Sequence, residues 1–204
     1  MKLKSPAKLN LYLRILNKRP DGYHNIVTVF ERIDLCDDII IKSWHNGIKI
    51  TCSDPNVPTG TENLAYKAAK ALLDYTGKRL SCCISIKKRI PVGGGLGGGS
   101  SNAATVLLGL NSLWKLKLSK KELMKIGSKI GADVSFFMLN ERFASASGIG
   151  ENLKPIKASK PIWHVLAAPN KGLVTRQIYA LWDRLYATEN SLTAARRDVK
   201  ILSQ

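Results

Sequence analysis

The sequence lacks several features that would assign a class of protein directly. Its four cysteines show no CxxC spacing, and neighbouring Cys82 and Cys83 would point to opposite faces of a strand, so we expect reduced structural thiols rather than a metal or redox site. No apolar run approaches the roughly 18 to 20 residues of a membrane helix. The first residues alternate polar and apolar types and do not open a signal-peptide core. We therefore expect a cytoplasmic protein without a membrane partner.

Acidic residues are scarce, with 15 Asp and Glu against 32 Lys and Arg, which gives a net charge of +17. This balance favours an anionic partner such as a nucleic acid, a nucleotide or a phosphorylated metabolite, and charge alone does not choose among them. Part of the positive charge has a simpler interpretation, because the lysine-rich stretch 115–129 can be the solvated face of a helix. A hydrophobic fraction of 45% over 204 residues is enough for a sizeable core.

The sequence also lacks repeats and low-complexity linkers, and its first half shows patterns typical of strands. KLNLYLRIL (8–16) alternates strictly, which predicts a half-buried strand with one apolar face. That face consists of Leu9, Leu11, Leu13 and Ile15. Further strands are predicted over 25–33, 38–44 and 48–53, and the Asn-Gly pair between the last two indicates a tight hairpin.

The second half mixes helices with strands. A helix is predicted over 62–75, with Gly77 available to end it, and another begins at Ser119, whose spacing to Glu122 is that of a capping box. The remaining expected elements are a strand over 81–88, a helix over 100–114, strands near 142–147 and 162–168, and a helix near 175–187. Because no regular βαβ alternation appears, the predicted class is α+β.

The segment PVGGGLGGGSSNAA (91–104) has six glycines in the seven positions from 93 to 99 and leads into a helix. Glycine is costly in regular structure, so such a segment needs a reason. Where bare backbone precedes a helix, unpaired N–H groups and the helix dipole can surround a phosphate. The Gly-Lys-Ser/Thr ending of a Walker loop is missing, and the match to a dinucleotide fingerprint is weak in so glycine-rich a run. The segment therefore predicts a phosphate site without indicating its chemical purpose.

Three stretches together resemble the signature of the GHMP small-molecule kinases: SPAKLNLYL near the start, the glycine-rich segment, and GADVSFF (131–137). DGYH (21–24) and IGENLKPI (149–156) narrow the resemblance to the branch that acts on a cytidine-diphosphate-linked sugar alcohol of the non-mevalonate isoprenoid pathway. It runs from about Ser5 to Ile156, with weaker similarity through Tyr179. It implies transfer of the γ-phosphate of ATP, with Mg²⁺, to the 2-hydroxyl of the methylerythritol unit. We assign no residue of the sequence as a metal ligand.

The resemblance also implies roles for individual residues. Asp133 matches the catalytic aspartate, which would accept the hydroxyl proton, and Lys8 matches the catalytic lysine, which would hold that aspartate ionised. Taken without the motif, Lys8 is an ordinary solvated strand lysine and Asp133 a turn residue. The phosphate cradle would consist of Gly93, Gly94, Gly95, Leu96, Gly97, Gly98, Gly99, Ser100 and Ser101.

Two further groups of residues are implied in the same way. Asn63 and Lys88 match contacts to the adenosine part of ATP, although a helix-start asparagine and a solvated lysine explain them nearly as well. The substrate contacts would be Asn10, Tyr23, His24, Thr175 and Tyr179, with Tyr23 and His24 recognising the cytosine. A histidine after a tyrosine is otherwise an ordinary surface or core residue, and Tyr179 could equally be a core aromatic.

The family fold would consist of a ribosomal-protein-S5-domain-2-like domain over 1–157 and an incomplete second α+β domain over 158–204. Ser135 stands where the family usually has proline, and Asn140 lies near a usual glycine; neither change removes a reacting group. Family members continue well beyond this length, so we expect a truncated chain of undetermined activity. Two alternatives stay open: an RNA-binding domain that uses its basic faces, and a kinase relative that binds nucleotide without turnover.

Overall fold

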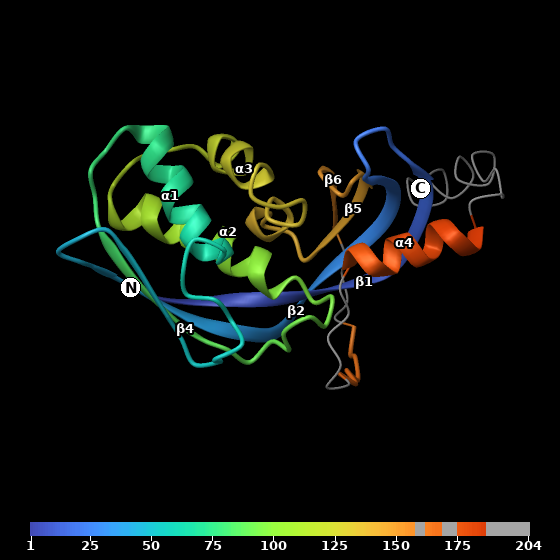
Figure 1. The fold of residues 1–204 in the computed structure, drawn as a ribbon. Coiled ribbons are helices and arrows are strands. Elements are labelled where there is room, and N and C mark those ends of the chain that lie inside the picture. Colours follow the sequence, from blue (N-terminus) through green and yellow to red (C-terminus); the bar gives the residue numbers. More distant parts are fainter. Residues whose placement is uncertain (158–161, 169–174, 187–204) are drawn as a thin grey trace. The chain divides into compact units, whose positions relative to one another are not determined.

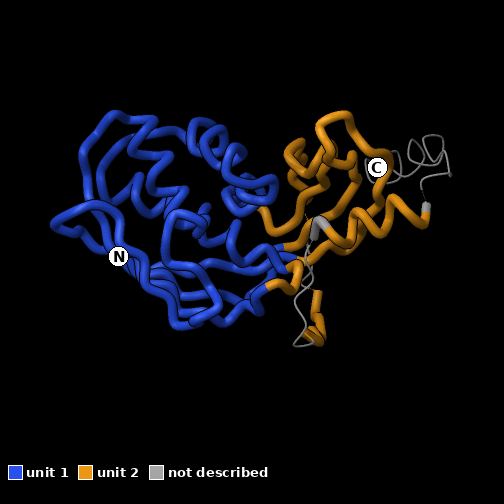
Figure 2. Tube along the Cα trace, viewed as in Figure 1, with its two compact units in different colours: residues 1–8, 32–92, 96–140 blue, residues 9–31, 93–95, 141–204 orange. Residues whose placement is uncertain are grey.

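The computed structural model describes residues 1–157, 162–168 and 175–186. The chain forms two compact units, shown in Figure 2: residues 1–8, 32–92 and 96–140 make up the first, and residues 9–31, 93–95 and 141–204 the second. Two long strands, β1 (Lys2–Lys18) and β2 (His24–Ser43), each contribute residues to both units. The two strands predicted over 25–33 and 38–44 are therefore one continuous strand.

In the first unit, β2 pairs antiparallel with β4 (Cys82–Lys87), and β4 pairs in parallel with β3 (Ile48–Cys52). The helices α1 (Leu64–Thr76), α2 (Gly98–Leu113) and α3 (Lys120–Ser128) lie on one face of this sheet (Figure 1). A short 3₁₀ turn, η1 (Phe136–Met138), follows α3. The core between sheet and helices contains Ile39, Ile41, Ile84, Leu72, Leu107 and Leu110.

The predicted hairpin between β2 and β3 is wrong, because β4 lies between these two strands. The chain does turn at Gly47, whose φ is +65°, and the Gly47 amide donates to Ser81 Oγ over 3.0 Å. After the turn, however, β3 runs parallel to β4, and a parallel pair requires a crossover connection, which α1 supplies. A local turn signal therefore identified the turn but not the pairing.

The helix ends are formed as the sequence predicts. Asn63 precedes α1, and its side chain accepts a hydrogen bond from the Ala65 amide, while Gly77 follows the helix in the left-handed conformation. At α3, Ser119 and Glu122 form a complete capping box. Both features depend on residues within a few positions of one another, which is why spacing alone predicts them.

In the second unit, the first half of β2 pairs antiparallel with β5 (Phe143–Gly148), and β5 pairs antiparallel with β6 (Asn152–Ile156). The predicted strand near 142–147 is therefore confirmed, and β6, with Pro155 in its short polar sequence, was not predicted. The helix α4 (Thr175–Tyr186) matches the prediction near 175–187. No helix among the described residues is long and apolar enough to cross a bilayer.

Two predictions about strands in this unit are wrong. Residues 162–168 form no strand in the described part of the chain, and Trp163 is 93% exposed. A strand needs a neighbour for its backbone hydrogen bonds, and an apolar pattern in the sequence does not supply one. The leucine face of β1 is not the buried one: Leu11 is 43% and Leu13 48% exposed. Alternation shows which residues share a face, but only tertiary packing decides which face is covered.

Candidate active site

Two motif residues far apart in the sequence meet in the first unit. Lys8 lies on β1 and Asp133 lies between α3 and η1, and Lys8 Nζ is 3.4 Å from Asp133 Oδ2. The lysine side chain is only 8% exposed and the aspartate 28%. A nearly buried ammonium needs an anionic partner, and the carboxylate that provides it keeps access to solvent. The structure thus brings the two residues together, with a partly exposed carboxylate beside a nearly buried ammonium group.

The glycine loop, residues Gly93–Gly99, ends at the start of α2 beside this pair. Gly97 precedes the helix with φ +68° and supplies no side-chain cap, so the first-turn amides of α2 have no partner within the helix. The Lys8 amide donates to the Leu96 carbonyl over 2.9 Å, which joins the loop to β1. Open amides at a helix N-terminus favour an anion, and phosphate is the anion that the motif predicts.

Gly97 is the position where only glycine can be accommodated. A Cβ built on it would lie 2.9 Å from Lys8 Cγ and 3.0 Å from Phe137 Cζ. Its positive φ would also strain any other residue. The glycine therefore allows the loop backbone to approach the lysine and the aromatic side chain that follows Asp133.

The two serines in the first turns of α2, Ser100 and Ser101, have different surroundings. Ser101 is fully buried, and its hydroxyl accepts a hydrogen bond from Ser5 Oγ over 2.8 Å. Ser100 is half-buried, and its Oγ lies 3.6 Å from the position that a Cβ on Gly131 would occupy, in the motif that carries Asp133. Of the two hydroxyls, Ser100 is thus the more exposed and lies next to the segment that carries Asp133, whereas Ser101 is used inside the protein.

The predicted adenosine contacts are both engaged within the protein. Asn63 is 6% exposed; its amide nitrogen donates to the Pro58 carbonyl over 2.6 Å, in addition to the cap that it forms on α1. Lys88 Nζ donates to Asp37 Oδ2 over 2.6 Å, and the lysine side chain is 8% exposed. Asn63 therefore caps a helix, as its simpler interpretation predicted. The contacts of Asn63 and Lys88 with adenosine stay predictions.

The predicted substrate residues lie in the second unit. Asn10 on β1 donates through Nδ2 to Thr28 Oγ1 over 2.7 Å, and the Thr28 hydroxyl donates to the Tyr12 carbonyl over 2.6 Å. Tyr23 is 61% exposed, which leaves its ring available for stacking on a ligand. Thr175 is the first residue of α4, and its side chain lies outside the described residues.

His24 is the centre of an aromatic and ionic cluster in this unit. It is 7% exposed, its Nε2 lies 2.6 Å from Asp183 Oδ1, and its ring centroid is 4.9 Å from that of Tyr179. Trp182 meets the histidine ring edge-on, with centroids 5.7 Å apart. Hydrogen bonds from Lys18 and from His24 hold the pKa of the Asp183 carboxyl below its usual range.

Sequence reasoning missed Trp182 and Asp183 but included Tyr179. Their spacing in the sequence could have identified them, because residues three and four positions after Tyr179 lie on the same face of a helix. A search for a partner of His24 along that face would have found both side chains. Their involvement also shows that α4, which has weak motif similarity, contributes to the cluster around the predicted cytosine-binding histidine.

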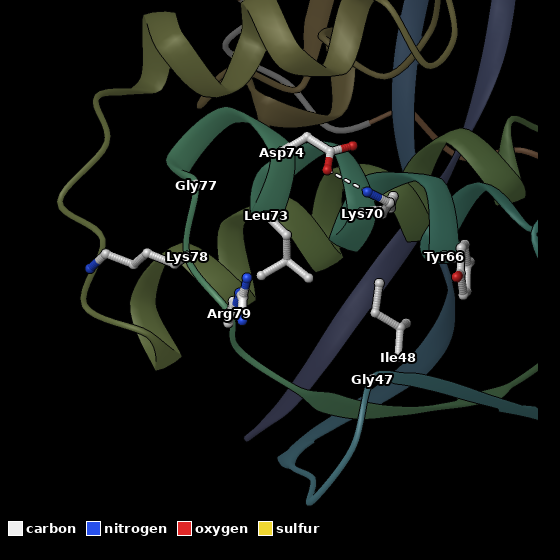
Figure 3. Close-up of a pocket in the computed structure, with 9 residues that line it drawn as sticks. All are labelled: Gly47, Ile48, Tyr66, Lys70, Leu73, Asp74, Gly77, Lys78 and Arg79. Carbon is white, nitrogen blue, oxygen red and sulfur yellow. Dashed lines mark hydrogen bonds and ion pairs between the residues drawn. The ribbon is translucent and has the colours of Figure 1, made fainter.

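Two observations concern ligands other than ATP and substrate. Over the residues that the structure describes, no group of three or more His, Cys, Asp or Glu could hold a metal ion. Figure 3 shows a surface pocket of about 470 Å³ in the first unit, which contains the ion pair of Lys70 with Asp74 but none of the predicted site residues. It is lined by Gly47, Ile48, Tyr66, Lys70, Leu73, Asp74, Gly77, Lys78 and Arg79.

Comparison with known proteins gives the same family as the motifs. The pattern of the GHMP kinases N terminal domain matches residues 63–141. A 4-diphosphocytidyl-2-C-methyl-D-erythritol kinase of Geobacter metallireducens is 49% identical over 87% of this chain, and one of another Geobacter species is 44% identical over all of it. A crystal structure of 4-(cytidine 5'-diphospho)-2C-methyl-D-erythritol kinase covers 76% of this chain with a TM-score of 0.64 and 40% identity.

These similarities cover only part of each relative. The chain spans 63% of the length of the first relative and 72% of the second, and 55% of the chain in the crystal structure. A mevalonate kinase structure from Methanococcus jannaschii, 19% identical with a TM-score of 0.59, shares the fold. The matched motifs, the Lys8–Asp133 pair and the sequence identity agree, and the chain therefore belongs to the GHMP kinases, in the family of the 4-diphosphocytidyl-2-C-methyl-D-erythritol kinases.

Proposed function

We propose that this chain transfers the γ-phosphate of ATP to the 2-hydroxyl of 4-diphosphocytidyl-2-C-methyl-D-erythritol. The observation that carries the proposal is the 3.4 Å contact between Lys8 and Asp133 beside the open amides at the start of α2. The names of the relatives supply the acceptor. ATP as the donor places the reaction in the cytoplasm. We keep residues 1–157 as the proposed ATP-binding domain and 158–204 as part of a second domain.

Phosphoryl transfer requires positioning, charge stabilisation and a group that receives the hydroxyl proton. In the proposed step, the Asp133 carboxylate accepts that proton while the hydroxyl oxygen bonds to the γ-phosphorus and the bond to the ADP oxygen breaks. Lys8 supplies a positive charge beside the Asp133 carboxylate and orients the hydroxyl. The first-turn amides of α2 donate to the phosphate oxygens, where negative charge gathers.

Mg²⁺ would enter this site with the nucleotide. The ion prefers oxygen ligands, retains several waters and is usually held by one or two protein groups together with phosphates, so a three-residue cluster is not needed. Although we assigned no metal ligand from the sequence, the hydroxyl of half-buried Ser100, next to Gly131 in the motif that carries Asp133, is an oxygen donor that would suit it. The ion would neutralise charge on the transferred phosphate.

The acceptor's cytosine would be recognised in the second unit. His24 offers a ring nitrogen whose partner, Asp183, fixes the orientation of the imidazole, and Tyr179 and exposed Tyr23 offer aromatic faces for stacking. Asn10 would contact the sugar-alcohol part, since it follows Lys8 by two positions on the same face of β1. None of the relatives and structures named above has a name that points to RNA binding, so we retain the kinase proposal.

The first test is Asp133→Asn, which keeps the size of the side chain and removes the base. We expect the turnover rate with ATP and the diphosphocytidyl acceptor to fall by about 10² to 10⁴-fold, with little change in ATP affinity. Asp74→Asn serves as the control, because Asp74 is exposed and pairs with Lys70 in the pocket of Figure 3, away from the predicted site residues. Equal turnover by wild type and Asp133→Asn would end the assignment of the base. ATP binding without turnover by the wild type would instead assign nucleotide binding alone.

A further inference from the structure

Asp37 is a fully buried acid that neither the motifs nor the proposed mechanism uses. It lies on β2, its side chain has no exposed area, and its carboxylate accepts four hydrogen bonds. Oδ1 accepts from the amides of Arg89 at 2.8 Å and Ile90 at 2.9 Å. Oδ2 accepts from Lys88 Nζ at 2.6 Å and from Asn102 Nδ2 at 3.0 Å. A buried carboxylate is costly, and this one has partners for both oxygens.

The four donors lie on the two sides of the glycine loop in the sequence. Lys88, Arg89 and Ile90 follow β4 just before the loop, while Asn102 lies in the first turns of α2 just after it. One carboxylate therefore holds both ends of the segment that supplies the phosphate-binding amides. Fixing the ends of a flexible loop reduces the entropy that ligand binding would otherwise have to remove.

The same network extends to the strand of the catalytic lysine. Asn102 Nδ2 also donates to Ser5 Oγ over 2.9 Å, and Ser5 Oγ donates to Ser101 Oγ over 2.8 Å. Ser5 and Ser101 are fully buried, and Asn102 is 4% exposed. Because Ser5 precedes Lys8 by three residues on β1, the network connects Asp37, the start of α2 and the strand of the catalytic pair. Such connected buried groups act together rather than as separate bonds.

We propose that Asp37 is a positioning residue that holds the glycine loop in its phosphate-binding conformation, and that Lys88 acts through Asp37 rather than by contact with the nucleotide. The inference rests on the proposed function for its ligand, ATP. It differs from the motif-based expectation for Lys88, because the structure uses the lysine's ammonium on a buried carboxylate 2.6 Å away. Neither residue touches the reacting atoms in this scheme.

The neighbouring residue provides a matched control. Asp38 follows Asp37 on β2 but points to the other side of the strand, where its carboxylate is 24% exposed and pairs with Lys4 and Arg89, each at 2.5 Å. Asp37→Asn and Asp38→Asn make the same chemical change one position apart. Only the first removes the charge from the network, so a comparison of the two variants separates positioning of the loop from a general loss of charge.

The binding experiment measures dissociation constants for ATP and for the diphosphocytidyl acceptor by calorimetry. We expect Asp37→Asn to weaken ATP binding by about tenfold or more, the effect of losing charge-assisted hydrogen bonds, and to leave acceptor binding unchanged. A general loss of structure in Asp37→Asn would weaken the binding of both ligands and not of ATP alone. Asp38→Asn should bind both ligands like the wild type. Equal ATP affinity of Asp37→Asn and wild type would overturn the proposal.

A double-mutant cycle tests the role of Lys88. If the lysine acts through Asp37, Lys88→Met weakens ATP binding in the wild type but adds little in the Asp37→Asn background. A lysine that contacts ATP directly would lower the affinity by the same factor in both backgrounds, and additive effects would therefore overturn this half of the proposal. The double variant also removes both members of the buried pair, which avoids leaving one charge without its partner.

Hydrogen exchange without nucleotide separates this inference from the proposed function. We read the exchange of the two hydrogen-bonded amides that join the loop to its surroundings, those of Ser101, which donates to the Gly97 carbonyl, and of Lys8, which donates to the Leu96 carbonyl. We expect both to exchange at least about tenfold faster in Asp37→Asn than in wild type or Asp38→Asn, whether or not the chain binds ATP. Unchanged exchange would contradict the positioning role. Failure of the wild type to bind ATP would contradict the proposed function alone. If Asp37→Asn does not fold, Asn102→Ala, which leaves the charge pair intact, must show faster exchange in the same amides for the inference to stand.

Discussion

Gly97 makes the most demanding single-residue contribution to the site, because it combines a positive φ with close contacts. Gly97→Ala adds a Cβ at 2.9 Å from Lys8 Cγ and 3.0 Å from Phe137 Cζ, in a conformation that already disfavours alanine. The clash acts on the loop and on Lys8 together. We expect ATP affinity and turnover both to fall by at least about tenfold, as calorimetry and a kinase assay would measure.

Gly77→Ala is the control for backbone strain. Its φ is +65° against +68° at Gly97, but a Cβ there meets nothing within 4 Å. This variant should lose about 1 kcal/mol of stability in urea unfolding and keep its ATP affinity. If the two variants lost ATP affinity equally, strain and not close approach would explain Gly97, and the interpretation of the loop geometry would be wrong.

The helix α4 is attached to the second unit through charged and aromatic contacts rather than through an extensive apolar face. Asp183 accepts from Lys18 Nζ and meets His24 Nε2, each at 2.6 Å, and Trp182 packs against the histidine. Ile178, Leu181 and Leu185 on the same helix are 42%, 43% and 61% exposed. The position of this element therefore depends on the ionisation of one carboxyl group.

This dependence gives a prediction for pH. Hydrogen bonds from Lys18 and then from His24 lower the pKa of Asp183 from its usual 3.8, so the ionised form favours the folded state. Its contribution to stability is present above pH 3.8 and is lost as the pH falls through the lower folded-state value. The unfolding temperature of wild type should thus exceed that of Asp183→Asn at pH 6, and the difference should vanish at strongly acidic pH. A difference of the same size at both pH values would contradict this account. In a Lys18→Met background, the difference in unfolding temperature at pH 6 should be smaller, because the main hydrogen bond that lowers the pKa of Asp183 is removed.

The charge of the entire chain affects how an anionic ligand reaches the site. A net charge of +17 attracts nucleotides from a distance. Salt shortens the range of this attraction, because the electrostatic screening length falls from about 10 Å at 0.1 M ionic strength to about 3 Å at 1 M. We expect the association rate constant for ATP, measured by stopped flow, to fall severalfold over this range. An uncharged osmolyte at matched viscosity controls for diffusion. A salt effect confined to dissociation would show that local contacts, and not the overall field, attract the ligand.

Features of this protein that depend on residues close in sequence are predictable from the sequence alone. These include the caps at Asn63, Gly77 and Ser119, the glycine loop before α2 and the positions of most helices, because backbone conformation and hydrogen bonding there are decided within a few residues. The pairing of Lys8 with Asp133 was also anticipated, although only through motifs shared with a family, since nothing local connects two residues so far apart.

Other features were decided by tertiary structure. The insertion of β4 between β2 and β3, the exposure of Leu11 and Leu13, and the four donors around Asp37 all depend on which distant segments meet. Sequence periodicity shows which residues share a face of an element, but it does not show which segment packs on that face. The free energy that selects the covered face and pairs a buried carboxylate comes from contacts between segments, and these exist only once the chain has folded.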